Sequence, residues 1–304
     1  IVKMALSQCR RLFVDVLRSS TKSKQLCFSN RLLSTKIDHE DFALNYLDGD
    51  QSGIAVFSMR RHKAMNAMSR HMLKMIQEAV QTVKFDNDIR VVVIRSEVPG
   101  AFCTGADLKE RAKMKQSEVG AFVSNIRYLI SETCDLPQPT IAAIDGMALG
   151  GGLEMALACD MRVAASTAKM GLVETKLAII PGGGGTQRLP RLVGPAVAKE
   201  LMFTSRVVDG QEAARLGLVN HVVEQNEERD AAYQRSLQLA EEILPQGPIA
   251  IKVAKIAINK GSEVDLATGL AIEQACYAQV IPTKDRMEGL MAFKEKRPPK
   301  YRGE

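Results

Sequence analysis

The sequence predicts an α/β fold with crossover connections, followed by a helical C-terminal region. Short apolar runs typical of buried strands alternate with segments of helical spacing as far as about residue 195, and helical segments dominate after that point. The composition, 46% hydrophobic and 25% charged over 304 residues, is that of an ordinary globular protein and excludes collagen-like and low-complexity classes. No apolar run approaches the roughly 18–20 residues that span a bilayer, which argues against an integral membrane protein and a membrane partner.

The segment up to residue 96 begins with two strands, a helix and a third strand. Apolar residues bounded by turn residues predict strands over Phe42–Leu47 and Gly53–Met59. Apolar side chains at helical spacing predict a helix over Asn66–Lys84. The continuous β-branched run within Arg90–Ser96 is typical of a strand buried on both faces.

Glycine, proline and charged residues divide residues 97–195 into shorter elements. We expect a small-residue loop over Phe102–Asp107, and a buried helix over Leu153–Ala158 that follows three consecutive glycines, Gly150–Gly152. The other expected elements are helices over Leu108–Lys115 and Glu118–Thr133, strands over Thr140–Ile144, Met161–Ala165 and Met170–Leu172, and a helix opened by Pro181–Gly185.

Helical patterns fill most of the chain after residue 195, where a strand is expected over Leu218–Val223. Helices are expected over Arg229–Leu244, Ile249–Lys260, Val264–Gln279 and Thr283–Phe293. Residues Leu244–Pro248 mark the clearest boundary. We therefore predict a mixed core over 37–245 and a helical region over 246–304.

The first 36 residues differ from the rest in charge. Eight Lys and Arg stand against Asp15 alone, so residues 1–36 carry +7, and residues 37–304 carry −1 of the total of +6. A segment rich in Arg, Ser and Leu with almost no acid is typical of an organelle transit peptide, and the lack of a continuous apolar h-region argues against secretion. We predict a mitochondrial transit peptide over 1–36 and a location in the matrix. A disordered basic tail is the alternative.

The six cysteines form no CxxC pair, and the four histidines do not cluster. A structural zinc site or a disulfide framework is therefore not expected, and no metal is predicted. Cys103 lies beside a glycine-rich turn without an identifiable partner His, so we interpret it as a packing residue.

Two glutamates stand beside glycine clusters. Glu154 follows Gly150–Gly152 directly, and Glu174 lies between Gly171 and the run Pro181–Gly185. Taken singly, each could be a buried carboxylate satisfied by backbone donors. Two such acids about 20 residues apart favour an acid/base pair, because different surroundings can separate their pKa values.

Two loops offer backbone N–H donors at helix starts. One donor is Gly151, where the glycines let the backbone approach a ligand closely, and the other is Ala106 in the loop before the helix at Leu108. Two such donors from separate loops make an oxyanion hole. No Ser-His-Asp constellation accompanies them, so an enolate is expected rather than an acyl-enzyme. Neither G-x-x-x-x-G-K-[ST] nor G-x-G-x-x-G occurs, which argues against nucleotide sites.

The motifs together resemble the enoyl-CoA hydratase/isomerase (crotonase) family. The resemblance lies in Gly105–Lys109, Ala148–Glu154 and Ile180–Leu189, and extends over 40–304. It implies a ββα spiral core, a C-terminal region that forms a homo-oligomer (a trimer or hexamer), and addition of water to an enoyl-CoA thioester. No cofactor is implied, because CoA is part of the acyl-CoA substrate.

The resemblance also implies roles for individual residues. Ala106 and Gly151 match the oxyanion-hole donors. Glu154 matches the group that orients and deprotonates water for attack at Cβ, and Glu174 matches the group that gives a proton to Cα. The implied substrate and CoA contacts are Lys63, Ala64, Ala106, Asp107, Leu108, Lys109, Gly151, Phe293 and Lys296. Where the family often has Asn-Arg-Pro, this chain has Arg60-Arg61-His62, which leaves the CoA contacts open.

RNA binding is an alternative function. Within the family the chain most resembles a mitochondrial member also described as binding AU-rich RNA through a lysine-rich helix. The matching face here holds Arg70, Lys74 and Lys84, but Glu78 interrupts it. With a net charge of −1 outside the leader, a solvated helix face is the better interpretation. A general short-chain enoyl-CoA hydratase is a further alternative.

Overall fold

The structure, a computed structural model, describes residues 37–304. The predicted transit peptide over 1–36 lies outside the described residues. Contacts join residues 37–304 into one compact unit. Within the described part, no helix is both long enough and apolar enough to cross a membrane.

The larger sheet has six strands in the order β1-β2-β3-β5-β7-β10. Its strands are β1 (Phe42–Tyr46), β2 (Ile54–Met59), β3 (Val91–Ser96), β5 (Thr140–Ile144), β7 (Met161–Ala165) and β10 (His221–Val223). β1 pairs with β2 antiparallel, and every later pair is parallel. Val91–Ile94 are all buried, as the β-branched run predicted, because helices cover both faces of the sheet.

A second sheet has four short strands in the order β4-β6-β8-β9. They are β4 (Ala101–Cys103), β6 (Met147–Leu149), β8 (Lys169–Gly171) and β9 (Val208–Asp209). The expectation of a loop from Phe102 was therefore wrong at Phe102 and Cys103. Two- and three-residue strands are too short to leave an alternating pattern.

The two sheets are built from successive ββα units. β3 and β4 precede α3 (Leu108–Arg111) and α4 (Gln116–Cys134), and β5 and β6 precede α5 (Gly151–Ala158). β7 and β8 lead, through the short 3-10 helix η4 (Glu174–Leu177), into α6 (Gly185–Val193). This repetition is the ββα architecture that the resemblance implied. α7 (Pro195–Phe203) and α8 (Gly210–Arg215) complete this half and were not expected.

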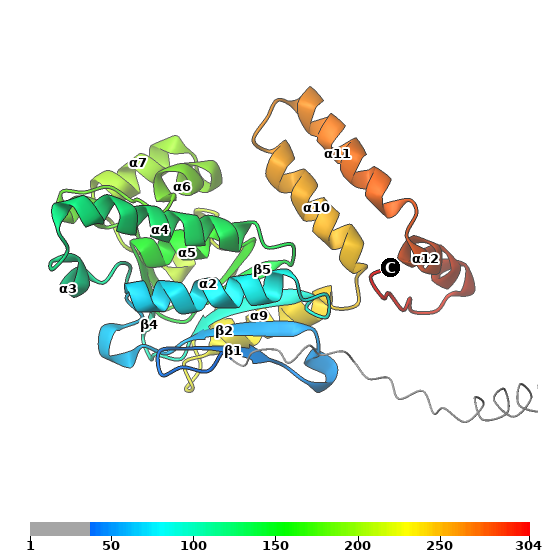
Figure 1. Cartoon of the computed structure of the whole chain (residues 1–304), viewed down its shortest axis with the longest axis horizontal. Helices are drawn as coiled ribbons and strands as arrows, with labels where there is room; N and C mark the ends of the chain where they lie inside the picture. Colours follow the sequence, from blue (N-terminus) through cyan, green and yellow to red (C-terminus); the bar gives the residue numbers. More distant parts are fainter. Residues whose placement is uncertain (1–36) are drawn as a thin grey trace, which may run out of the picture. The chain divides into compact units, whose positions relative to one another are not determined.

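Helix α2 (Arg70–Lys84) begins four residues later than the expected start at Asn66. Met65 and Asn66 adopt left-handed backbone conformations, with φ of 49° and 57°, so neither belongs to a helix. Ser69 caps the helix by accepting a hydrogen bond from the Met72 N–H. The buried face of α2 carries the methionines and aliphatic residues that predicted it, and Figure 1 shows α2 and α4 lying side by side over the sheet.

The C-terminal helices are α9 (Ala231–Ile243), α10 (Pro248–Gly261), α11 (Leu266–Val280) and α12 (Lys284–Glu295). α9 packs on the sheet opposite α2. Lys255 joins α10 to the core, because its buried Nζ donates to Asp160 Oδ2 (2.7 Å) and to the Gln138 carbonyl (2.9 Å). Figure 1 labels α10–α12 at the C-terminal end of the chain. In contrast to α9, these helices carry many exposed apolar side chains, among them Ile258, Leu266, Leu270, Tyr277, Leu290 and Phe293.

Candidate active site

Met68 holds the backbone on both sides of Ala106. The Met68 N–H donates to the Gly105 carbonyl (2.7 Å), and the Met68 carbonyl accepts from the Asp107 N–H (3.0 Å). In this parallel bridge between Met68 and Ala106, the groups of Ala106 itself point away from Met68. Ala106 lines a cavity, and its N–H is thus presented there.

Gly151 is the first residue of α5, where the N–H has no carbonyl one turn earlier to bond. A side-chain carbon on Gly151 would lie 2.5 Å from Met68 Cε and 3.7 Å from the Ala106 nitrogen. A side-chain carbon on Gly105 would lie 3.2 Å from the Gly151 nitrogen. The glycines therefore let the two predicted donors, Ala106 and Gly151, approach one another closely.

Glu154 is buried on α5, with 2% of its surface exposed. Its Oε1 accepts hydrogen bonds from the N–H groups of Gly183 (2.8 Å) and Gly185 (2.7 Å). Burial raises the pKa of Glu154, while these two bonds and the charges of Arg188 and Arg127 oppose the rise. The glycine run Pro181–Gly185 therefore supplies the N–H groups that hold the Glu154 carboxyl group.

Glu174 begins η4 and lines the same cavity as Glu154. Burial and the neighbouring charge of Glu154 raise the pKa of Glu174 to about 7, against the lowering effect of one backbone hydrogen bond. Its Oε2 is buried and has no hydrogen-bond partner among the described residues. A side-chain carbon on Gly150 would lie 3.2 Å from Glu174 Oε1, so this glycine makes room for the carboxyl group.

One cavity of about 150 Å³ is lined by both N–H donors and both glutamates. The rest of its wall is largely apolar and includes Leu108, Val123, Ile126, Val173, Leu177 and Ile180. Concave apolar sites with a few convergent polar groups are typical of small-molecule binding. The structure thus brings together the four residues that the sequence selected.

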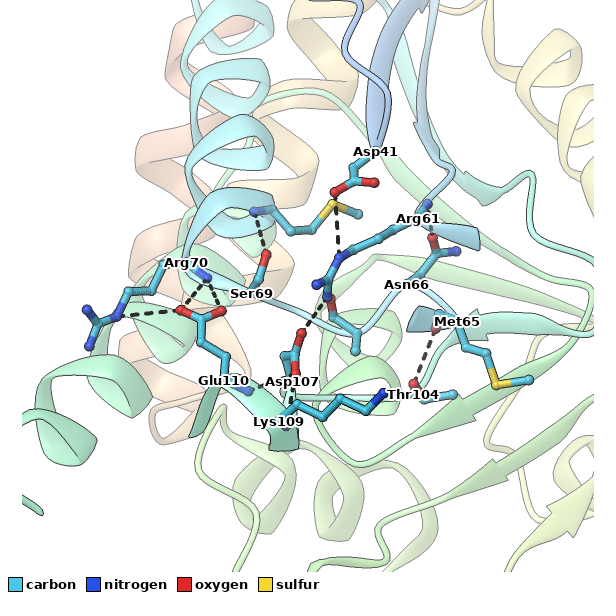
Figure 2. A network of polar contacts seen from close by, with 12 residues as sticks. Asp41, Arg61, Met65, Asn66, Ser69, Arg70, Thr104, Asp107, Lys109 and Glu110 are labelled. Atoms are coloured by element: carbon cyan, nitrogen blue, oxygen red, sulfur yellow. Dashed lines mark hydrogen bonds and ion pairs between the residues drawn. The ribbon is translucent and has the colours of Figure 1, made fainter. Parts of the chain in front are cut away.

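A polar network surrounds the Ala106 loop (Figure 2). Asp107 Oδ1 accepts from the N–H groups of Lys109 and Glu110 (both 3.0 Å), which caps α3. Asp107 Oδ2 accepts from Arg61 Nη1 (2.8 Å). Although partial burial raises the pKa of Asp107, these bonds and the charge of Arg61 outweigh it, and the pKa is lowered overall. Asp107 is therefore a fixed carboxylate beside the donor.

Asn66 connects this network to the sheets and was missed by the sequence reasoning. Its fully buried amide accepts from the Arg61 N–H (2.8 Å) and donates to Ser96 Oγ (2.7 Å) and the Phe102 carbonyl (2.9 Å). The Thr104 N–H in turn donates to the Met65 carbonyl (3.2 Å). An Asn as the first residue of the expected helix was the signal for this role, because Asn tolerates the left-handed conformation that it adopts here.

A profile of the enoyl-CoA hydratase/isomerase family matches residues 49–304. The chain belongs to this family. It is 64% identical over 272 residues to the mitochondrial methylglutaconyl-CoA hydratase of Mus musculus, covering 89% of this chain and 87% of that protein. It is 57% identical over 257 residues to the mitochondrial enoyl-CoA hydratase domain-containing protein 2 of Mus musculus, covering 84% and 87% of the two chains.

Solved structures agree with the family assignment. The enoyl-CoA hydratase of Bacillus anthracis superposes with a TM-score of 0.83 at 46% identity, covering 87% of this chain and all of that one. The predictions of the enoyl-CoA hydratase/isomerase family, of an enoyl-CoA hydratase and of an α/β fold with a helical C-terminal region are confirmed.

The geometry suits the chemistry of an enoyl-CoA hydratase/isomerase. Two backbone N–H donors close together in one cavity can stabilise a negative oxygen as it develops on a thioester. Two carboxyl groups in different surroundings can accept and donate the protons of a hydration. Among the residues described, no group of three His, Cys, Asp or Glu could hold a metal ion.

Most of the other predicted substrate and CoA contacts lie outside the cavity lining. Leu108 lines the cavity, whereas Ala64, Asp107 and Lys109 lie outside its lining. The side chain of Lys63 is 92% exposed, and Phe293 is 87% exposed. Lys63, Phe293 and Lys296 also lie outside the lining, and their contacts with CoA stay predictions.

The basic residues on α2 are each paired with a carboxylate. Arg70 pairs with Glu110 and Glu118, Lys74 with Glu78, and Lys84 with Glu132. Cys103 is fully buried, and burial raises the pKa of its thiol to about 12, in accord with a packing role.

Proposed function

We propose that this protein adds water across the α,β double bond of 3-methylglutaconyl-CoA, giving 3-hydroxy-3-methylglutaryl-CoA in leucine degradation. The observation that carries the proposal is the single cavity that holds two N–H donors and two glutamates. The acyl group is taken from the 64% identical relative whose name contains it.

The N–H groups of Ala106 and Gly151 bind the thioester oxygen in this proposal. Glu154 orients a water molecule and accepts its proton as the oxygen attacks Cβ, since two N–H bonds favour the charged form of this carboxyl group. The π electrons of the α,β double bond shift towards the carbonyl, which places negative charge on the thioester oxygen of an enolate. Glu174, with a pKa of about 7, then delivers its proton to Cα. The reaction needs no cofactor beyond the CoA of the substrate.

Turnover of a panel of enoyl-CoA thioesters by the purified protein tests the proposal. We expect kcat/KM to be highest with 3-methylglutaconyl-CoA. A higher value with unbranched short-chain thioesters such as crotonyl-CoA would favour the alternative of a general short-chain hydratase and contradict the proposed substrate.

We do not include RNA binding in the proposed function, since Arg70, Lys74 and Lys84 each pair with a glutamate. A salt titration of RNA binding by the mature protein tests this choice. Tight binding with a steep salt dependence would contradict it.

The proposal includes a mitochondrial matrix location, with removal of the leader after the Arg31–Lys36 region. The mitochondrial relatives and the charge of +7 over 1–36 support it. Mass spectrometry of protein isolated from mitochondria tests it, and an intact terminus at Met4 would contradict the cleavage.

The proposal also includes a homotrimer, or a hexamer of two trimers, assembled through residues 246–304. The exposed apolar side chains on α10–α12 support it, because exposed apolar patches of this kind mark interfaces. Sedimentation at working concentration tests it. A fully active monomer would contradict both the assembly and any contribution of Phe293 or Lys296 to a neighbouring site.

A further inference from the structure

Arg111 places a positive charge in the wall of the active-site cavity. It is the last residue of α3, is half-buried, and is the one cation among the described residues that line the cavity. The catalytic proposal assigns it no task, because hydration of an enoyl thioester needs the two donors and the two glutamates alone.

The carboxylates nearest to Arg111 in the sequence are already engaged. Asp107 binds Arg61 and caps α3, and Glu110 binds Arg70. Throughout residues 37–304, no carboxylate lies within ion-pair distance of the Arg111 guanidinium. The cavity therefore presents an arginine that no carboxylate of the described chain neutralises.

A guanidinium on a largely apolar wall selects a planar anion. Its fork of N–H groups matches the two oxygens of a carboxylate, and a desolvated pair of this kind is stronger than one in water. In the proposed reaction the two N–H donors bind the thioester oxygen, and the two glutamates serve the reacting carbons. No other part of that reaction needs the guanidinium. The anion that Arg111 suits is thus a second, distal carboxylate on the acyl group.

The distances along the chain fit this assignment. The Arg111 N–H donates to the Asp107 carbonyl (2.9 Å), so Arg111 lies one helical turn, about 5–6 Å, beyond the residue that follows Ala106. In a five-carbon dicarboxylic enoyl thioester, the distal carboxyl carbon lies about 5 Å from the thioester carbon, given carbon–carbon bonds of about 1.5 Å. The flexible arginine side chain can cover the remaining separation.

We propose that Arg111 binds the distal carboxylate of a dicarboxylic enoyl-CoA and thereby determines acyl-group specificity. This inference rests on the proposed function, whose substrate carries such a carboxylate. An acyl group of similar size without the carboxylate leaves the guanidinium unpaired, and a charged hydrogen bond of this kind corresponds to about a 10- to 100-fold difference in kcat/KM.

The test compares three thioesters: crotonyl-CoA, which lacks the distal carboxylate, glutaconyl-CoA, which has it, and 3-methylglutaconyl-CoA, which adds the methyl group. Arg111→Met is expected to reduce the kcat/KM ratio of each dicarboxylic thioester to crotonyl-CoA by about 10- to 100-fold. Arg111→Lys keeps the charge without the fork and is expected to retain part of the preference. Arg111→Gln provides a second neutral variant if the methionine variant does not fold.

Lys113→Met is the matched control, since it removes one positive charge two residues away from an exposed position outside the cavity lining. It is expected to keep the wild-type ratios. If wild type prefers the dicarboxylic thioesters and a folded Arg111→Met keeps that preference, the assignment of Arg111 is wrong while the proposed function stands.

Failure of the proposed substrate, with the role of Arg111 intact, gives a different pattern of kcat/KM values. If wild type prefers glutaconyl-CoA through Arg111 but does not hydrate 3-methylglutaconyl-CoA, the proposed substrate is wrong and the role of Arg111 stands. If wild type shows no preference for either dicarboxylic thioester, both are wrong.

Discussion

Glu154 and Glu174 line one cavity, but their surroundings differ. Glu154 accepts hydrogen bonds from two N–H groups of the glycine run that leads into α6, and these bonds together with the charges of Arg188 and Arg127 oppose the rise in its pKa that burial causes. Glu174 has a buried oxygen with no hydrogen-bond partner within residues 37–304, and burial raises its pKa to about 7. The comparison teaches that the same side chain becomes a fixed proton acceptor or an available proton donor according to the backbone that surrounds it.

Removing either carboxyl group has the largest expected effect. Glu154→Gln and Glu174→Gln are each expected to lower kcat by about 10²–10⁴-fold, because each removes a positioned acid or base. Circular dichroism checks that the fold is retained. Near-wild-type turnover by either variant would remove that residue from the mechanism.

A substitution in the glycine run that binds Glu154 tests how strongly catalysis depends on the position of this carboxyl group. In Gly183→Ala the new methyl carbon would lie 2.7 Å from both Glu154 Oε2 and Ile130 Cδ1, so the carboxyl group must move. A loss of about 10- to 100-fold in kcat is expected, as for other small misplacements of catalytic groups. The control is Gly120→Ala in α4, where a side-chain carbon meets nothing within 4 Å and activity should be unchanged. Equal effects of the two variants would contradict the positional argument.

The pKa of Glu174 predicts a dependence on pH. Since protonated Glu174 donates the proton, kcat/KM for hydration is expected to fall about tenfold per pH unit above pH 7. The folded-state pKa lies above the ordinary value of 4.5, so ionisation destabilises the fold progressively between about pH 4.5 and pH 7. Glu174→Gln should therefore match wild type in thermal stability near pH 4.5 and exceed it at pH 8. A constant difference in Tm between these pH values would show that Glu174 does not titrate in this range.

Changing the charge around Glu154 has the smallest expected effect. Arg188 lowers the pKa of Glu154, and its Nη1 donates to the Gly183 carbonyl (3.0 Å). Arg188→Met is expected to raise the pKa of Glu154 and move the acidic limb of the kcat/KM profile upward, with a loss of about 3- to 10-fold below neutral pH. Arg191→Met on the same helix, where Arg191 pairs with Glu263 at the surface, is the control. An unchanged acidic limb in Arg188→Met would mean that this charge is screened from Glu154.

The sequence by itself determined the elements that local patterns specify. Continuous β-branched residues predicted β3, helical spacing predicted α2, and glycines beside glutamates selected Glu154 and Glu174. These signals are readable because strand burial, helix periodicity and close backbone approach each impose a residue type at a fixed spacing.

Tertiary structure decided what depends on contacts between distant segments. The four-stranded second sheet escaped prediction because its strands are two or three residues long and are defined by their partners. The bridge between Met68 and Ala106 and the hydrogen bonds of Asn66 to the sheets join segments 30–38 residues apart in the sequence. The position of Arg111 in the cavity wall likewise depends on segments that only the fold brings together. The pKa of Glu174 is likewise set by burial and by Glu154, which no spacing in the sequence records. Local sequence patterns identified the residues of this site. Packing between distant segments determined their positions and shifted their pKa values.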